Sequence, residues 1–237
     1  MISHLANIDA GATIGKNVSI QSFTTIYDDV IIGDETEIGA NVTIYSGARI
    51  GKNCKIFPGA VISAEPQDLK FGGEYTTTEI GDGTIIRECV TIHRGTNDRK
   101  KTVIGDNCLL MCYVHIGHDC LIGNNVIIAN SSGISGHVTI EDWAIMTSVR
   151  KNVPPFIRAA REPLAYAGIN AIGLRRRRIS DEKLKMIEDI YRNLYILNNS
   201  ISSGVSSIES EIPDSDEKKL VLEFIKDSKK GIIKGPL

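Results

Sequence analysis

The chain has 237 residues, a formal net charge of −2 and an isoelectric point near 6.2. It is long enough to bury the core of one large domain or two modest ones. The charge balance argues against a protein whose main task is to coat nucleic acid, and no apolar run of about 18 residues predicts a membrane span. MISHLANIDAG at the start lacks the features of a signal peptide, so we expect a cytoplasmic location. Five cysteines, an odd number, favour reduced thiols.

Isoleucine occupies every sixth position from Ile2 to Ile62 without exception. The same phase, with Leu and Met also allowed, returns from Ile80 to Ile92 and from Ile104 to Met146. A period of six indicates short strands joined by regular corners, the hexapeptide repeat of a parallel β-helix. Three hexads make a triangular coil of 18 residues, and neighbouring coils lie about 4.8 Å apart. We therefore predict a mainly β fold, with a β-helix over residues 1–148.

Two stretches interrupt the ladder without changing its phase: SAEPQDLKFGGEYTTTE at 63–79 and HRGTNDRKKTV at 93–103. We expect both to be loops that leave the coil wall, where functional residues tend to collect. After Met146 the pattern stops, because Asn152 falls where the next aliphatic residue is due and VPPF follows. The segment 149–179 is expected to be a connection that carries a basic cluster.

From Ser180 onward the hydrophobic period becomes helical, with Ser180 as the expected N-cap. One helix face carries Leu184, Ile187, Tyr191, Leu194 and Tyr195. We predict a small C-terminal α-helical domain over 180–237. Within it we expect a polar linker from Ser200 to Ser207 and a further helix from Asp214 to Lys229.

Four of the five histidines lie close together in the sequence: His93, His115, His118 and His137. Cys108 and Cys120 fall on the small inward position of the hexad, so we expect them in the core. A mixed Cys/His zinc site then loses its thiolates, while an all-histidine site remains open. His115 and His118 flank inward positions and should project outward.

The coil length of 18 places Gly136 over His118, and His137 over Asp119. A space without a side chain is thereby left over the His118 imidazole, where a substrate hydroxyl and a carbonyl carbon could meet. We expect His118 to act as a general base there, with a backbone donor near the forming oxyanion. Asp119 could fix the imidazole tautomer, provided that a corner separates the two residues, since adjacent side chains in a strand point apart. Ordinary surface histidines are the alternative.

A basic run, LRRRR at 174–178, offers guanidinium groups for a diphosphate or for phosphopantetheine. A solvated basic face is the alternative interpretation.

Five segments resemble the UDP-N-acetylglucosamine 3-O-acyltransferases that begin lipid A biosynthesis, and they follow in the family's order. They are SAEPQDLKFGGE, IRECVTIHRGT, LLMCYVHIGHDCLIGN, SGHVTIEDWAI and GINAIGLRRR. The resemblance implies left-handed winding, an exception to the usual crossover rule. It also implies a homotrimer with active sites in clefts between neighbouring β-helices. The reaction would move a 3-hydroxyacyl chain from the phosphopantetheine thioester of acyl carrier protein to the sugar 3-hydroxyl, with no metal and no further cofactor.

Carried over to this sequence, the resemblance makes His118 the general base, Asp119 its partner and the Gly136 amide the oxyanion donor. Eight further residues would hold the nucleotide sugar and the donor: Gln67, Asp68, Lys70, His115, His137, Asn170, Arg176 and Arg177. Ile172 stands where the family commonly has Glu, so one sugar contact is absent.

Between Ile145 and Asn152 the chain lacks roughly 20 residues that the family carries, which is about one coil. In the family this segment holds a His-Gln pair near both substrates and a residue that limits acyl-chain length. We therefore expect a shortened β-helix of about eight coils rather than ten, whose ends need not rejoin in register. The length of the acyl donor stays open.

Three functions compete on the sequence. The first is acyl transfer to UDP-N-acetylglucosamine, and the second is a trimeric binder of nucleotide sugar or acyl carrier protein that has lost catalysis with the missing coil. The third is a zinc-dependent hexapeptide hydratase with three histidines from neighbouring subunits, although only two residues separate His115 from His118. Whether the acceptor presents a 3-hydroxyl or a 3-amine is also open.

Overall fold

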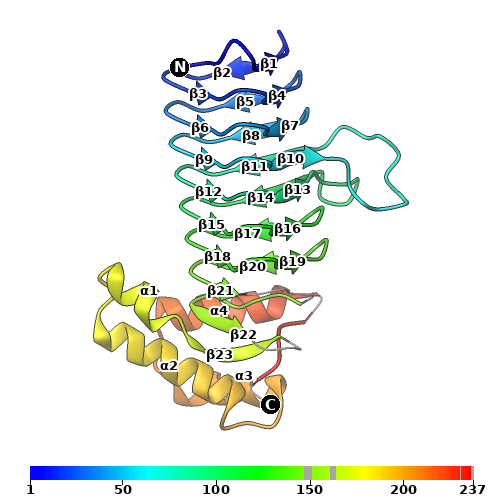
Figure 1. The fold of residues 1–237 in the computed structure, drawn as a ribbon. Coiled ribbons are helices and arrows are strands. Elements are labelled where there is room, and N and C mark those ends of the chain that lie inside the picture. The colour runs from blue at the N-terminus through cyan, green and yellow to red at the C-terminus, as the bar shows by residue number, and fades with distance from the viewer. Residues whose placement is uncertain (147–150, 161–163, 230, 236–237) are drawn as a thin grey trace.

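The computed structural model describes residues 1–146, 151–160, 164–229 and 231–235. The chain winds from its N-terminus as a stack of coils built from very short strands, and it ends in a helical part below the stack (Figure 1). The strands form three parallel sheets, which make the three faces of a parallel β-helix.

The first sheet contains β1 (Asn7–Ile8), β4 (Thr25–Ile26), β7 (Thr43–Ile44), β10 (Val61–Ala64), β13 (Thr91–His93), β16 (His115–Ile116) and β19 (Gly133–Ile134). The second contains β2 (Thr13–Ile14), β5 (Ile31–Ile32), β8 (Ala48–Ile50), β11 (Thr77–Ile80), β14 (Lys101–Ile104), β17 (Leu121–Ile122) and β20 (Thr139–Ile140). The third contains β3 (Ser19–Ile20), β6 (Glu37–Ile38), β9 (Lys55–Ile56), β12 (Ile85–Ile86), β15 (Leu109–Leu110), β18 (Ile127–Ile128), β21 (Ile145–Met146), β22 (Ile157–Ala160) and β23 (Ala165–Ile169).

Strands one coil apart pair in parallel with the register that the repeat predicts. Asn7 pairs with Thr25, and Ile127 pairs with Ile145, each a step of 18 residues. From β1 to β21 each face has seven strands, so the described stack has seven coils. An Ile2–Ile20 bridge before β1 and the pairing of β21 with β22 extend the stack at its two ends, so the expected count of about eight coils rather than ten is close.

The inward isoleucines form the predicted ladder through the axis of the stack. Ile44, Ile62, Ile92 and Ile116 are fully buried, and nearly all the other inward positions are buried as well. Burying one such side chain contributes roughly 1.5–3 kcal/mol, so the ladder is the main source of stability in a chain with 5% aromatic residues. Cys108 and Cys120 are buried in this core, and each thiol donates to a backbone carbonyl of the next coil, as predicted for core cysteines.

A second periodic feature lies at the corners of the coils, where every sixth residue adopts a positive φ. Members of this set include Asn17, Phe23, Asp29, Glu35, Asn41, Asn53, Cys89, Asn107, Tyr113, Asp119, Asn125, Ser131, His137 and Trp143. Positive φ is uncommon outside glycine, and Asn and Asp tolerate it best. The backbone therefore turns sharply at these positions, and the side chains on either side of a corner can converge.

The two loops are shorter than the sequence interruptions. They cover residues 65–76 and 94–100, because Thr77 pairs with Lys101 and the strands β11 and β14 extend into both interruptions. The first loop projects far from the stack (Figure 1). At its base the Tyr75 hydroxyl donates to Asp29 Oδ2 at 3.0 Å and accepts from Arg49 Nη2 at 2.8 Å, which fixes the loop to the coil wall.

Beyond β21 the stack continues with a shortened turn. Met146 pairs in parallel with Ala159, and Ile140 bridges to Val153, so the step falls from 18 residues to 13. β23 then runs antiparallel to β22. The segment expected to be a plain connection thus contains two strands and α1 (Ala171–Arg176). The expected position of the missing coil includes residues 147–150, which lie outside the described residues.

The remaining helices are α2 (Asp181–Tyr195), α3 (Ile201–Glu211) and α4 (Asp216–Asp227). The Ser180 side chain accepts from the Lys183 backbone N–H at 3.3 Å, which confirms the predicted N-cap. The polar linker expected from Ser200 was wrong, because α3 begins there. Ser200 and Ser203 form a capping box, and a Cβ on Gly204 would lie 2.8 Å from the Leu194 carbonyl oxygen, so glycine permits close packing on α2.

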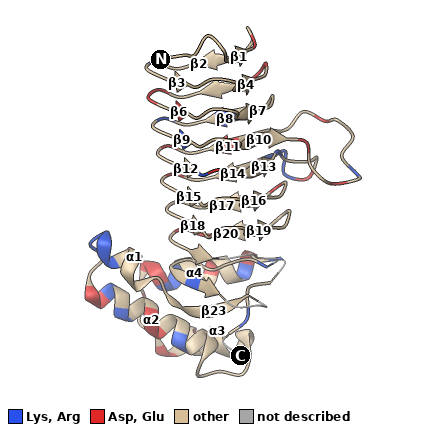
Figure 2. Ribbon diagram, in the orientation of Figure 1, with Lys and Arg blue, Asp and Glu red and all other residues tan. Residues whose placement is uncertain are grey.

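Tyrosines fasten the helical part to the end of the stack. The rings of Tyr166 on β23 and Tyr195 on α2 stack at 4.9 Å, and the Tyr191 hydroxyl donates to the Pro155 carbonyl at 2.7 Å. Figure 2 shows that Lys and Arg residues gather around the end of α1. Within the described part of the chain, none of the helices combines the length and the apolarity that crossing a bilayer requires.

Candidate active site

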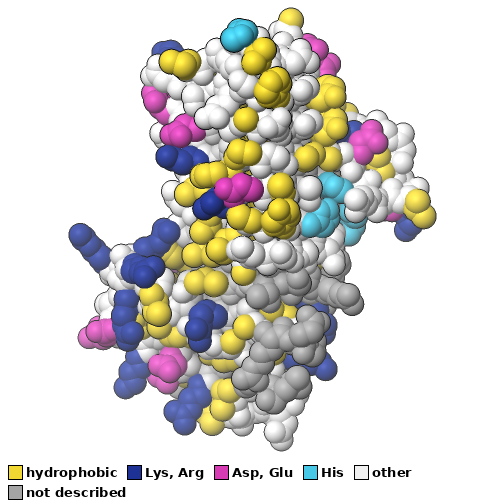
Figure 3. All heavy atoms as spheres, in the orientation of Figure 1, with side chains coloured by type: hydrophobic (Ala, Val, Ile, Leu, Met, Phe, Trp, Pro, Cys, Tyr) yellow, Lys and Arg dark blue, Asp and Glu magenta, His cyan; other side chains and the backbone are white. Residues whose placement is uncertain are grey.

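The described histidines other than His4 form one cluster on the coil wall beside the projecting loop (Figure 3). We call it the histidine cluster: His93, His115, His118 and His137. His93 ends β13 and His115 begins β16, while His118 and His137 lie at corners one coil apart. The rings meet edge to face in two pairs, His93 with His115 at 4.8 Å and His118 with His137 at 4.9 Å.

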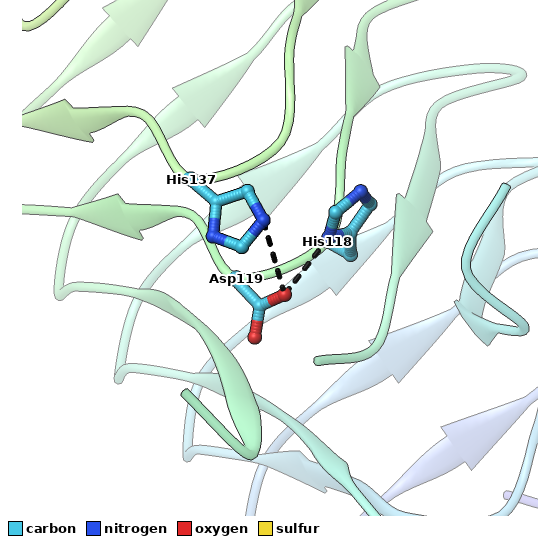
Figure 4. Close-up of side chains that lie close together, drawn as sticks. All are labelled: His118, Asp119 and His137. Atoms are coloured by element: carbon cyan, nitrogen blue, oxygen red, sulfur yellow. Dashed lines mark hydrogen bonds and ion pairs between the residues drawn. The ribbon is translucent and has the colours of Figure 1, made fainter. Parts of the chain in front are cut away.

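His118 and Asp119 converge because the chain turns a corner between them. Asp119 has φ +57°, so its side chain does not point away from its neighbour as it would in a strand. His118 Nδ1 lies 2.8 Å from Asp119 Oδ2 (Figure 4). The expected corner between His118 and Asp119 is therefore present, and we call the two residues the dyad. Because an ionised carboxylate only accepts hydrogen bonds, Nδ1 is the nitrogen that carries the proton when the imidazole is neutral.

Asp119 is fully buried, and the loop of residues 94–100 surrounds its carboxylate. Oδ1 accepts from the backbone N–H groups of Thr96 at 3.0 Å and Arg99 at 3.1 Å. Oδ2 accepts from the Thr96 hydroxyl at 2.7 Å as well as from His118. Burial raises the pKa of Asp119, but the hydrogen bonds from His118, Thr96 and Arg99 outweigh it, so the pKa lies below its ordinary value. The carboxylate is therefore ionised at neutral pH.

His137 lies between two carboxylates. Its Nδ1 is 3.0 Å from Asp98 Oδ2, and its Nε2 is 3.9 Å from Asp119 Oδ2 (Figure 4). The backbone N–H of His137 donates to the His118 carbonyl at 2.9 Å, so the two corners are stacked as the coil length predicts.

Gly136 leaves room for the reactive edge of His118. A Cβ at Gly136 would lie 2.7 Å from His118 Nε2 and 2.8 Å from Cε1, so any side chain there would occupy the space over the imidazole. Among the described residues Nε2 has no hydrogen-bond partner, while Nδ1 is held by Asp119. His118 Nε2 can therefore accept a proton from a substrate group that lies beside Gly136.

His115 and His93 are held neutral beneath this space. The Thr91 hydroxyl lies 2.8 Å from His115 Nδ1, and burial together with the charge of His118 lowers the pKa of His115. Burial, followed by the charges of His115 and His118, lowers the pKa of His93 to about 4. His93 is 6% exposed, and its Nδ1 has no partner among the described residues.

The buried His93 predicts a pH-dependent loss of stability. Folded His93 stays neutral down to about pH 4, whereas in the unfolded chain it takes up a proton near its ordinary pKa of 6.5. The unfolded state thus binds more protons between these values, so stability is full above pH 6.5 and falls as the pH drops toward 4. Between pH 7.5 and pH 5 we expect wild type to lose about 2 kcal/mol of unfolding free energy relative to His93→Phe, measured by denaturant titration.

The exposed His4 supplies the control for this experiment. His4→Phe makes the same substitution at an exposed position, so its unfolding free energy should track wild type at both pH values. An unchanged gap between wild type and His93→Phe at pH 7.5 and pH 5 would show that His93 titrates normally in the folded protein.

The three residues expected in the first loop are grouped on the projecting segment. Gln67 and Lys70 are exposed, and Asp68 is half-buried and accepts from the Lys70 backbone N–H at 3.0 Å. His115 and His137 belong to the histidine cluster itself. These five residues and the dyad therefore occupy one side of the chain.

The other three expected binding residues are on α1 and just before and after it, across the molecule from the projecting loop (Figure 1). Asn170 is buried: its Nδ2 donates to the Trp143 carbonyl at 2.8 Å, and its Oδ1 accepts from the Gly173 N–H at 3.2 Å. The Arg177 guanidinium lies 4.4 Å over the Trp143 ring and donates to Asn125. Arg176 is exposed. One chain does not bring this set together with the histidine cluster.

Three of these residues also offer the geometry of a metal site. In the described parts of the chain, ligand atoms of His118, Asp119 and His137 lie within 4.8 Å of one another. The Asp119 carboxylate, however, already accepts hydrogen bonds from Thr96, Arg99 and His118, and His137 presents Nε2 to it at 3.9 Å while its Nδ1 faces Asp98. A cation would have to displace these hydrogen bonds, so the donor set fits a hydrogen-bonded dyad better than a metal centre.

Sequence reasoning missed the residues of the second loop that hold the dyad. Thr96, Asp98 and Arg99 were inside an interruption expected to carry function, but nothing in their spacing singled them out. The signal available was only the interruption itself, since the repeat fixes the position of wall residues and not of loop residues.

Comparisons with known proteins agree with the fold. The model of bacterial transferase hexapeptide repeats matches residues 11–46, 29–64 and 101–136, and a model described as UDP-N-acetylglucosamine O-acyltransferase, domain 2, matches residues 152–233. The repeat and these matches define a hexapeptide-repeat transferase. The predicted fold class, a left-handed parallel β-helix followed by helices, is confirmed.

The relatives specify the family. Acyl-(acyl carrier protein) UDP-N-acetylglucosamine O-acyltransferases from Aliivibrio fischeri and Thermodesulfovibrio yellowstonii are 44% and 37% identical, over 97% and 98% of this chain and 96% and 98% of their own lengths. The chain belongs to the UDP-N-acetylglucosamine O-acyltransferase family. The Thermodesulfovibrio alignment runs over 253 residues, more than the 237 of this chain, as expected for relatives with additional residues.

Solved structures agree with this assignment. The UDP-N-acetylglucosamine acyltransferase of Bacteroides fragilis superposes with a TM-score of 0.86 and 44% identity, covering 99% of this chain and all of that chain. That of Francisella novicida gives 0.89 and 35% identity, over 100% of this chain and 95% of that chain.

Proposed function

We propose that the protein transfers a 3-hydroxyacyl chain from acyl carrier protein to the 3-hydroxyl of UDP-N-acetylglucosamine, the first step of lipid A biosynthesis. The observation that carries the proposal is the His118 imidazole, held through Nδ1 by a buried carboxylate and open at Nε2 beneath Gly136. The named activity of the relatives supports the substrates. The hydratase alternative is less favoured, because a cation shared by His118, Asp119 and His137 would compete with the hydrogen bonds from Thr96, Arg99 and His118 to the Asp119 carboxylate.

The proposed roles account for each proton in such a transfer. His118 Nε2 takes the proton of the sugar hydroxyl as its oxygen attacks the thioester carbonyl, and charge develops on the carbonyl oxygen. The Gly136 amide is the proposed donor to this oxyanion. Collapse breaks the C–S bond, and the phosphopantetheine thiolate recovers the proton from His118. Ionised Asp119 stabilises the imidazolium between these steps.

We further propose that the site is completed by a second subunit in a homotrimer. Asn170, Arg176 and Arg177 lie across the chain from the histidine cluster, so they can reach the same substrate only from a neighbouring chain (Figure 1). The exposed arginines offer bidentate contacts for a diphosphate. Of the three, Arg176 has the most freedom, since Asn170 and Arg177 are held by Trp143 and its neighbours.

A single assay tests the proposed reaction. Purified protein is mixed with UDP-N-acetylglucosamine and a panel of 3-hydroxyacyl carrier proteins whose acyl chains differ in length. The masses of the products are measured by mass spectrometry. We expect one acyl chain on the sugar nucleotide, with a preferred length, because the dyad is intact. A 3-amino analogue of the acceptor, run in parallel, distinguishes oxygen from nitrogen acylation.

The binder alternative predicts a different result in the same samples. No acyl product would form with any donor, while calorimetry would still detect binding of UDP-N-acetylglucosamine. That outcome would reject acyl transfer and assign the loss to the shortened end of the stack.

A further inference from the structure

Among the described residues, Thr96 gives the most hydrogen bonds to the Asp119 carboxylate. Thr96 contributes two donors, its backbone N–H to Oδ1 at 3.0 Å and its hydroxyl to Oδ2 at 2.7 Å. Thr96 is buried, with 8% of its surface exposed, and Asp119 is fully buried, so these bonds lie largely away from the solvent-exposed surface of the chain. Two bonds from a single residue, one to each oxygen, fix the plane of the carboxylate as well as its position.

The hydroxyl of Thr96 shares Oδ2 with His118. Oδ2 accepts from Thr96 at 2.7 Å and lies 2.8 Å from His118 Nδ1, so Thr96 sets the oxygen that faces the imidazole. Arg99 also binds Asp119: its backbone N–H donates to Oδ1 at 3.1 Å, and its Nη1 donates to the Asp119 backbone carbonyl at 2.8 Å. The ionisable groups near Asp119 are Arg99, His118 and His137, with Asp98 beyond His137.

We propose that Thr96 is a positioning residue that, through Asp119, keeps the proton of neutral His118 on Nδ1 and its lone pair on Nε2. The tautomer is a property of the protein alone. Its consequence for turnover rests on the proposed function, since only a base at Nε2 uses that lone pair.

Without the hydroxyl, Oδ2 of the fully buried Asp119 carboxylate loses a donor. A buried acceptor that loses its partner costs about 1–3 kcal/mol, and the carboxylate can recover part of this by rotating toward other donors. Rotation withdraws Oδ2 from the line of Nδ1. The energy difference between the two imidazole tautomers is then reduced, and a fraction of His118 carries its proton on Nε2, where it cannot act as a base.

Two substitutions separate the hydroxyl from the shape of the side chain. Thr96→Val keeps the backbone N–H and the volume but removes the hydroxyl, and Thr96→Ser keeps the hydroxyl. Thr102→Val is the matched control, because the Thr102 side chain is fully buried on β14 and its hydroxyl has no partner among the described residues. It tests a buried Thr-to-Val change close to the site without touching Asp119.

Two readouts follow on the intact protein. The ¹⁵N chemical shifts of the His118 ring, assigned by comparison with His118→Ala, distinguish a protonated from an unprotonated nitrogen. Steady-state kinetics with the preferred donor give kcat and KM. For Thr96→Val we expect the His118 signals to move toward a tautomer mixture and kcat to fall about 10- to 100-fold with KM little changed. Thr96→Ser and Thr102→Val should match wild type in both.

Each outcome decides the proposal. Unchanged His118 shifts in Thr96→Val would overturn it, and so would equal effects of Thr96→Ser and Thr96→Val, since the hydroxyl would then not matter. If wild type makes no acyl product but the shifts change as expected, the proposed reaction fails and the positioning role stands. If wild type is active and the shifts stay fixed, the reaction stands and the positioning role fails.

Discussion

His118→Ala is expected to lower kcat by about 10²- to 10⁴-fold, the usual range for loss of a general base. The reason is geometric: His118 Nε2 faces the space beside Gly136, while His118 Nδ1 is hydrogen-bonded to Asp119. The fold should survive, because His118 projects outward and the isoleucine ladder beneath it is untouched. Turnover by mass spectrometry and the mass of the assembly by sedimentation measure both.

The exposed His4, at the far end of the stack, provides the control. His4→Ala should leave turnover and assembly as in wild type. A His118→Ala protein that keeps turnover within about tenfold of wild type, with the assembly intact, would remove His118 from the role of base.

Gly136→Ala should lower kcat by about 100-fold or more, while the unfolding free energy falls by no more than about 1–3 kcal/mol, the cost of separating His118 from buried Asp119. The new methyl would lie 2.7 Å from His118 Nε2, so the imidazole must move away from Asp119 or lose the space above it. The Gly136 backbone does not have a positive φ, so alanine itself is not strained there. Kinetics combined with a denaturant titration separate the two effects.

Gly133→Ala, three residues before Gly136 on the same coil, is the matched control. A Cβ at Gly133 meets nothing within 4 Å, so turnover should be unchanged. If Gly136→Ala were as active as wild type, the space over His118 would not be where the substrate reacts.

The repeat predicted the parts of the structure that depend on counting. Isoleucine every six residues placed the ladder, the core cysteines and the stacking of Gly136 over His118, because each coil repeats the same backbone path. The alignment of β1 to β21 follows the same arithmetic. What counting did not show was the corner at Asp119, since positive φ is a property of the turn and not of residue type alone.

The remaining wrong or missing predictions concern segments whose composition does not indicate their structure. Ser200 to Ser207 has the composition of a linker, yet Ser200 caps a helix and Gly204 lets it pack closely on α2. The loop of residues 94–100 shows no period, so nothing marked Thr96 as the partner of a residue 23 positions away. Partners fixed by a tertiary fold leave no trace in local patterns.

A stack of parallel strands ends in rows of unpaired backbone groups, on which another molecule could add a strand. The third sheet of this chain does not end that way, because its last strand, β23, runs antiparallel to β22 and α2 packs against it. Addition of another coil in register is thereby blocked at this end. The short 13-residue turn, which breaks the coil rule, brings that barrier into place directly after β21, so the segment that shortens the protein also protects it from growing end to end into filaments.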